Sequence, residues 1–88
     1  MVHLITYDLN KPGQNYDELY EAIKSLGSWW HYLDSTWLVD TNLSTQKIFD
    51  RIHPKMDSSD YLLIIAVKAD YQGWLPKDAW DWIKKHLD

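Results

Sequence analysis

An aspartate at the end of the first apolar segment is the side chain in this sequence best placed for chemistry. Asp8 closes an apolar run over residues 2–9, inside the triplet Tyr7-Asp8-Leu9. Carboxylate oxygens are hard ligands for Mg²⁺, which stabilises the transition state of phosphodiester cleavage. In a two-fold dimer, two copies of Asp8 would meet and build a site from one residue of each chain. Asp8 is therefore the candidate catalytic and metal-binding residue, and its competing role is to cap the turn at residues 10–13.

Other side chains offer weaker chemistry. His31 lies between Trp30 and Tyr32 and could act as a general base, although a histidine in this setting is more often a half-buried sheet residue. The other three histidines show no metal-ligand spacing, and Ser35 lacks the glycine-flanked turn of a serine nucleophile. Three scattered glycines cannot form a phosphate-binding loop. The sequence leaves open whether the chain is an enzyme, and it predicts no cofactor besides the Mg²⁺ of the nuclease hypothesis.

Aromatic residues are unusually frequent, with six Trp, six Tyr and one Phe among 88 residues. A domain of this size cannot easily bury all of them, and clustered surface Trp and Tyr often mark an interface. The expected interface residues are Trp30, Tyr32, Trp37 and Trp82. Trp82 is the best single candidate, because it falls outside the apolar stripe of the last predicted helix. These residues predict a homodimer or a protein partner, and the alternative is a tryptophan-rich core.

Composition narrows the remaining function classes. The net charge of −4 disfavours nonspecific nucleic-acid binding, although a local basic patch or a metal-bridged phosphate contact stays open. An aromatic base-stacking platform like that of the RNA-recognition motif is disfavoured for the same lack of basic neighbours. No apolar run approaches the roughly 20 residues that span a bilayer, so we expect no membrane association. The absence of cysteine and of a signal-peptide pattern favours the cytoplasm.

Periodicity and turn signals predict the elements that would position these residues. Four segments are rich in β-branched and aromatic residues and predict strands: residues 2–9, 29–33, 36–41 and 61–67. Apolar residues at helical spacing predict three helices, beginning near Asn15, Ser44 and Pro76. Gly27 is expected to end the first helix in a left-handed conformation.

The order of these elements predicts the fold class. Strand, helix, two strands, helix and strand, followed by a helical tail, match the split βαβ arrangement called ferredoxin-like. We therefore expect a single α+β domain over residues 1–88, with a four-stranded antiparallel sheet and two helices on one face. The other face would need cover from the C-terminal helix, a partner or a second copy of the chain.

Three segments together resemble a known family. They are Leu4-Ile5-Thr6-Tyr7-Asp8-Leu9, the helical segment at residues 15–27, and the aromatic hairpin at residues 29–41. They closely resemble the small bacterial proteins of the SinR-like family, strongly over residues 3–41 and in outline beyond. The same pattern is more distantly similar to the CRISPR-associated adaptation proteins of the Cas-two type and to VapD-like ribonuclease toxins.

The resemblance implies a ferredoxin-like fold and a dimer. It also implies that Asp8 matches the aspartate assigned to divalent-metal binding near the dimer axis of the Cas-two type proteins. Those proteins carry basic residues soon after this aspartate. Here the region holds only Lys11, followed by the acidic Asp17, Glu18 and Glu21, which disfavours nuclease activity.

Three function hypotheses follow. The leading one is a dimeric interaction module of the CRISPR-adaptation-like fold without catalytic activity. The second is a Mg²⁺-dependent endonuclease or toxin-like ribonuclease that uses Asp8 at the dimer interface. The third is a toxin–antitoxin or phage-related component that blocks another protein through an acidic, aromatic surface.

Overall fold

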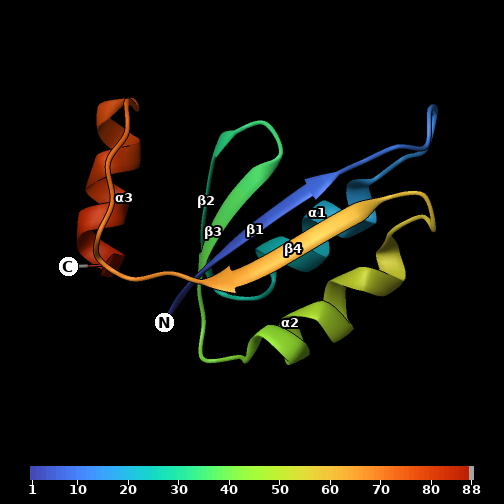
Figure 1. The fold of residues 1–88 in the computed structure, drawn as a ribbon, viewed down its shortest axis with the longest axis horizontal. Coiled ribbons are helices and arrows are strands. Elements are labelled where there is room, and N and C mark those ends of the chain that lie inside the picture. The colour runs from blue at the N-terminus through green and yellow to red at the C-terminus, as the bar shows by residue number, and fades with distance from the viewer. Residues whose placement is uncertain (88) are drawn as a thin grey trace.

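The fold is ferredoxin-like, as the order of elements predicts. The structure is a computed structural model and describes residues 1–87. Its elements are β1 (Val2–Asp8), α1 (Asp17–Lys24), β2 (Ser28–Leu33), β3 (Thr36–Asp40), α2 (Thr45–Ile52), a 3₁₀ turn (His53–Lys55), β4 (Tyr61–Ala66) and α3 (Lys77–Leu87). The strands form one antiparallel sheet in the order β2-β3-β1-β4 (Figure 1). β2 and β4 are therefore the two edge strands.

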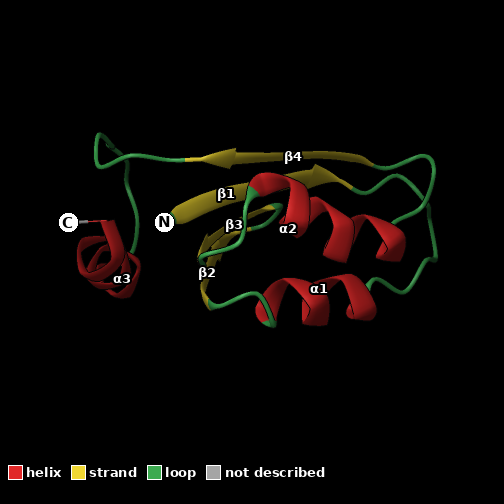
Figure 2. Cartoon of the chain, turned by 90° about the horizontal axis from the view of Figure 1, so that it is seen from below, coloured by secondary structure: helices red, strands yellow, loops and turns green. Residues whose placement is uncertain are grey.

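Helices α1 and α2 pack on one face of the sheet, and the main core lies between these two layers (Figure 2). Successive side chains of a strand point to opposite faces, so every second residue of a strand enters this core. The buried core residues are Ile5, Tyr7, Tyr16, Leu19, Ile23, Leu26, Trp37, Val39, Ile48 and Ile52. Leu62 and Ile64 of β4 add partly buried side chains to this layer.

Side-chain hydrogen bonds lie at the starts of α1 and α2. The hydroxyl of Ser44 accepts a hydrogen bond from the Lys47 amide at 3.2 Å, as expected for an N-terminal cap. At the start of α1, the Asn15 side chain accepts from the Asp17 amide at 2.8 Å. The expectation that Gly27 adopts a left-handed conformation is wrong, because among the described residues only Gly13 has a positive φ. Gly27 instead allows close approach of the chain to the carbonyl of Asp40.

Helix α3 stands apart from α1 and α2 and packs on the opposite side of the sheet (Figures 1 and 2). Ala79 and Ile83 of this helix bury Trp30 of β2 in a second, smaller apolar cluster. α3 reaches the β2–β3 half of this face and leaves β4 uncovered. No helix within the described part of the chain is both long and apolar enough to cross a membrane.

Candidate functional site

The sheet face opposite α1 and α2 is the candidate site, and it is called the open face below. The strand registers place its side chains in rows, with Trp30 opposite Leu38, Leu38 opposite Leu4, and Leu4 opposite Ile65. The open face is made of Leu4, Thr6, Asp8, Trp30, Thr36, Leu38, Tyr61, Leu63 and Ile65. One row is therefore apolar across all four strands.

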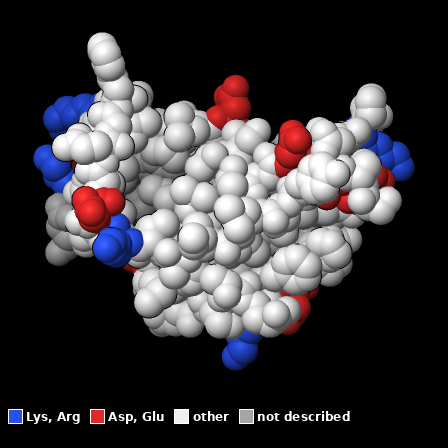
Figure 3. All heavy atoms as spheres, viewed as in Figure 1, with Lys and Arg blue, Asp and Glu red and all other residues white. Residues whose placement is uncertain are grey.

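The β4 part of the open face is exposed. Tyr61, Leu63 and Ile65 keep 72%, 55% and 50% of their surface accessible. Figure 3 shows the middle of the molecule in this view free of Lys, Arg, Asp and Glu, with the charged residues around its rim. Contiguous exposed apolar side chains with a polar rim are typical of an interaction surface. β4 is also an edge strand, so its outer backbone groups are free to pair with another strand.

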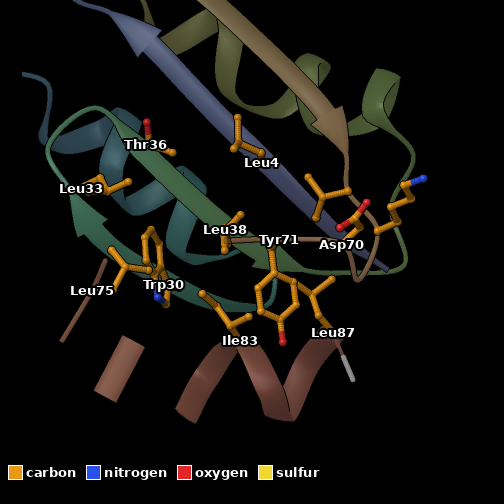
Figure 4. A pocket seen from close by; sticks show the side chains of 12 residues that line it. Leu4, Trp30, Leu33, Thr36, Leu38, Asp70, Tyr71, Leu75, Ile83 and Leu87 are labelled. Carbon is orange, nitrogen blue, oxygen red and sulfur yellow. The ribbon is translucent and has the colours of Figure 1, made fainter. Parts of the chain in front are cut away.

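An apolar cavity of about 230 Å³ lies between the open face and α3. Leu4 and Leu38 of the sheet line one side, and Ile83 and Leu87 of α3 line the other (Figure 4). Leu75, Tyr71 and Trp30 contribute further apolar surface. The indole Nε1 of Trp30 is buried without a hydrogen-bond partner among residues 1–87. The cavity therefore offers contacts to apolar atoms.

Polar contacts hold the C-terminal half of α3 to the sheet. The Nδ1 atom of His86 lies 2.7 Å from a carboxylate oxygen of Asp40. The Trp82 indole donates to the Ser28 hydroxyl at 3.2 Å, and the Trp82 and His86 rings stack with centroids 4.1 Å apart. The hydrogen bond from His86 lowers the pKa of Asp40, against the opposing effect of partial burial. These contacts fix α3 over β2 and β3.

Asp8, the predicted catalytic and metal-binding residue, lies exposed at the end of β1 on the open face. It lines a shallow hollow with Thr6, Tyr61 and Leu63. Its carboxylate makes no hydrogen bond or ion pair within the described residues, and only its backbone carbonyl accepts, from the Asn10 side chain at 3.3 Å. No group of three or more His, Cys, Asp or Glu among these residues could hold a metal.

The turn after β1 is organised by Asp60 rather than by Asp8. One carboxylate oxygen of Asp60 accepts from the Asn10 amide at 2.7 Å and from the Tyr16 hydroxyl at 2.8 Å. The other oxygen accepts from the Asp57 amide at 2.8 Å. Burial acts to raise the pKa of Asp60, but these hydrogen bonds outweigh it and lower the pKa. The prediction that the Asp8 side chain caps this turn is therefore wrong.

Asp57 supports the same loop. Its carboxylate accepts from the hydroxyl and the amide of Ser59 at 2.6 and 3.0 Å and forms an ion pair with Lys11 at 3.3 Å. The Ser59 bonds lower the pKa of Asp57, and Lys11 adds to this effect. The signal in the sequence was the polar run at residues 57–60, whose Asp and Ser side chains favour such turns.

The predicted interface aromatics are not brought together on one surface. Trp37 is 1% exposed in the core, where its indole donates to the Tyr7 hydroxyl at 2.9 Å. Trp30 is 3% exposed under α3, and Trp82 is half-buried beside it. Of the four, only Tyr32 is exposed, at 46%. The tryptophans Trp30 and Trp37 thus serve the alternative role in the core.

His31 also has a structural environment. Its ring stacks on Trp37 with centroids 3.8 Å apart, and its Nδ1 lies 3.0 Å from the Thr36 carbonyl oxygen. The contacts fix the ring against the hairpin, as expected for a half-buried sheet histidine. Nothing in this arrangement pairs His31 with a nucleophile.

No protein-family model, curated protein or solved structure matches this chain. The resemblance to the SinR-like family and to the Cas-two type proteins therefore stays a prediction from the residues quoted above. The structural features that bear on function are the exposed apolar side chains of the open face and the cavity beside it.

Proposed function

We propose that this protein is a cytoplasmic, non-catalytic interaction module of the CRISPR-adaptation-like ferredoxin fold, which works as a homodimer joined through its open face. The observation that carries the proposal is the exposure of Tyr61, Leu63 and Ile65 on an edge strand. The apolar area of the open face is costly to leave in water, and burying it against a partner would favour association.

A second copy fits this surface for two reasons. A two-fold axis brings the same patch of both chains together, so an apolar patch is automatically matched by an apolar patch. The apolar row through Leu38, Leu4 and Ile65 carries no charge, so two chains of net charge −4 can meet along it, with Asp8 lying outside this row at the end of β1. The resemblance to dimeric families supports the same assembly.

Two substitutions on the open face test the dimer. Leu63→Glu and Ile65→Glu each place a charge in the proposed interface, and both side chains are half-exposed in the monomer, so the fold should persist. Trp29→Glu is the control, because Trp29 is 42% exposed and its ring contacts Trp37 of the helix-covered face. Sedimentation equilibrium should find a dimer for the parent and the control and a monomer for the two open-face variants. A dimer that survives both open-face charges would refute the proposed interface.

A second candidate function is Mg²⁺-dependent cleavage of nucleic acid by Asp8 across the dimer. Its support is the unpaired Asp8 carboxylate on the same face that we propose to dimerise. Asp8→Asn should then abolish Mg²⁺-dependent cleavage of DNA or RNA while leaving the dimer intact. Asp34→Asn in the β2–β3 turn is the matched control. Cleavage that persists in Asp8→Asn, or that is absent from the parent protein with Mg²⁺ or Mn²⁺, would refute this function.

A further inference from the structure

We infer that, in the homodimer, Trp74 of each copy inserts into the apolar cavity between the open face and α3 of the other copy. The inference rests on the proposed function, because it names a contact within the proposed dimer. It joins two features that the fold leaves unexplained: an almost fully exposed tryptophan and an apolar cavity beside it.

Trp74 is 98% exposed, more than any other large apolar side chain among residues 1–87. It lies in the segment that connects β4 to α3, whereas its neighbour Leu75 packs into the cluster around Trp30. Leu75 thus anchors the segment and leaves Trp74 facing solvent. An indole presented in this way is typical of the few residues that dominate binding energy at an interface.

The cavity suits a single side chain. Its volume of about 230 Å³ is smaller than the roughly 300–1,000 Å³ of usual small-molecule sites. Its lining is mostly apolar, with Leu4 and Leu38 on the sheet side and Ile83 and Leu87 on the α3 side (Figure 4). An aromatic ring inserted there would replace water against these side chains.

The positions of Trp74 and the cavity also fit a two-fold interface. Leu75 lines the cavity, so Trp74 is attached to the cavity's own wall. In a two-fold dimer, Trp74 of each copy would contact the cavity of the other copy, so Trp74 and the cavity must lie on the same contact surface. The cavity is continuous with the proposed interface, because Leu4 in its lining is paired with the exposed Ile65 of β4.

Three variants test the insertion by sedimentation equilibrium. Trp74→Ala removes the inserted indole, and Leu87→Trp fills the cavity. Trp29→Ala is a matched control at an exposed tryptophan of the helix-covered face. Trp74→Ala and Leu87→Trp should each raise the dimer Kd at least about tenfold, and Trp29→Ala should not. Mixing Trp74→Ala with Leu87→Trp should restore part of the lost association, because the mixed dimer recovers one of the two insertions of Trp74 into an open cavity.

The environment of Trp74 provides an independent readout. In protein labelled with 5-fluorotryptophan, the ¹⁹F resonance that disappears in Trp74→Phe should shift as concentration is raised through the Kd. An unchanged Kd in Trp74→Ala together with an unshifted resonance would overturn the insertion and leave the dimer standing. A parent protein that stays monomeric up to about 1 mM would overturn both the insertion and the proposed homodimer.

Discussion

The imidazole of His86 in the last turn of α3 contacts the carboxylate of Asp40 at the end of β3, with Nδ1 and Oδ2 2.7 Å apart. The two residues are 46 positions apart in the chain, and the second oxygen of Asp40 lies 3.2 Å from the amino group of Met1. One carboxylate therefore connects the C-terminal helix to the start of β1. Because α3 forms one wall of the apolar cavity, this contact also helps to hold the cavity in shape.

Replacing Asp40 should change the dependence of stability on pH. The hydrogen bond from His86 lowers the pKa of Asp40 in the folded chain. A lowered pKa contributes stability that is present above the unfolded value of about 3.9 and is lost as pH falls through the folded pKa. Asp40→Asn should therefore lower the thermal midpoint at pH 7 and match the parent more closely at the acid end of a pH series. A difference in midpoint that is constant across that series would contradict this role.

Two buried tryptophans should respond differently to loss of their indole N–H. Trp37 donates to the Tyr7 hydroxyl, so Trp37→Phe should lower the free energy of unfolding by about 1–3 kcal/mol. The Trp30 N–H is buried without a partner in the described chain, so Trp30→Phe also removes an unfavourable group and should stay within about 1 kcal/mol of the parent. Urea unfolding of the two variants measures the difference. Equal destabilisation would show that the ring volume outweighs the hydrogen bond.

The aspartates near the end of β1 should differ in their effect on stability. Asp60→Ala removes acceptors for Asn10, Tyr16 and Asp57, and the thermal midpoint should fall by about 5–10 °C. Asp8→Ala should change the midpoint by no more than about 2 °C, because no described residue bonds to its carboxylate. Differential scanning calorimetry at pH 7 distinguishes the two. A large fall for Asp8→Ala would mean that the carboxylate stabilises the turn after all.

Gly27→Ala should destabilise the start of β2. A Cβ at this position would overlap the backbone oxygen of Asp40, so the chain would have to move away from β3. Overpacking of this kind costs about 1–3 kcal/mol. Gly73→Ala is the control, because a Cβ there would meet only the Trp80 ring at 3.7 Å, an ordinary contact distance. Chemical denaturation should place Gly27→Ala well below the control.

The order of the elements could be predicted from the sequence because each has a local pattern. The apolar run of β1, rich in β-forming residues, the stripe of α1 and the Ser44 cap all act within a few residues. Asp60 could not be recognised in this way, because its partners Asn10 and Tyr16 lie 50 and 44 positions earlier in the chain. Its role depends on the antiparallel pairing of β1 with β4, which places the loop beside these residues.

The faces of the hairpin could not be predicted for a related reason. The pairing of β2 with β3 shifts register between Trp30 and Leu33, so simple alternation does not extend along β2. Trp37 enters the core because β3 pairs it with Ile5 of β1. Trp30 faces α3 because β2 pairs it with Leu38 on the other face, and both registers are set by the fold. Likewise, the apolar stripe of α3 shows that the helix packs somewhere, but only the fold shows that it stops short of β4.

The uncovered edge at β4 also affects how the protein behaves once it begins to unfold. The run Tyr61–Ala66 contains six uncharged residues, of which Tyr61, Ile64 and Ile65 have high β-propensity, and no proline or lysine to block pairing. Segments of this kind stack readily with copies of themselves. Heating or dilute denaturant should therefore lead to aggregation from this strand, and thermal unfolding of the parent chain should be poorly reversible unless the edge is covered.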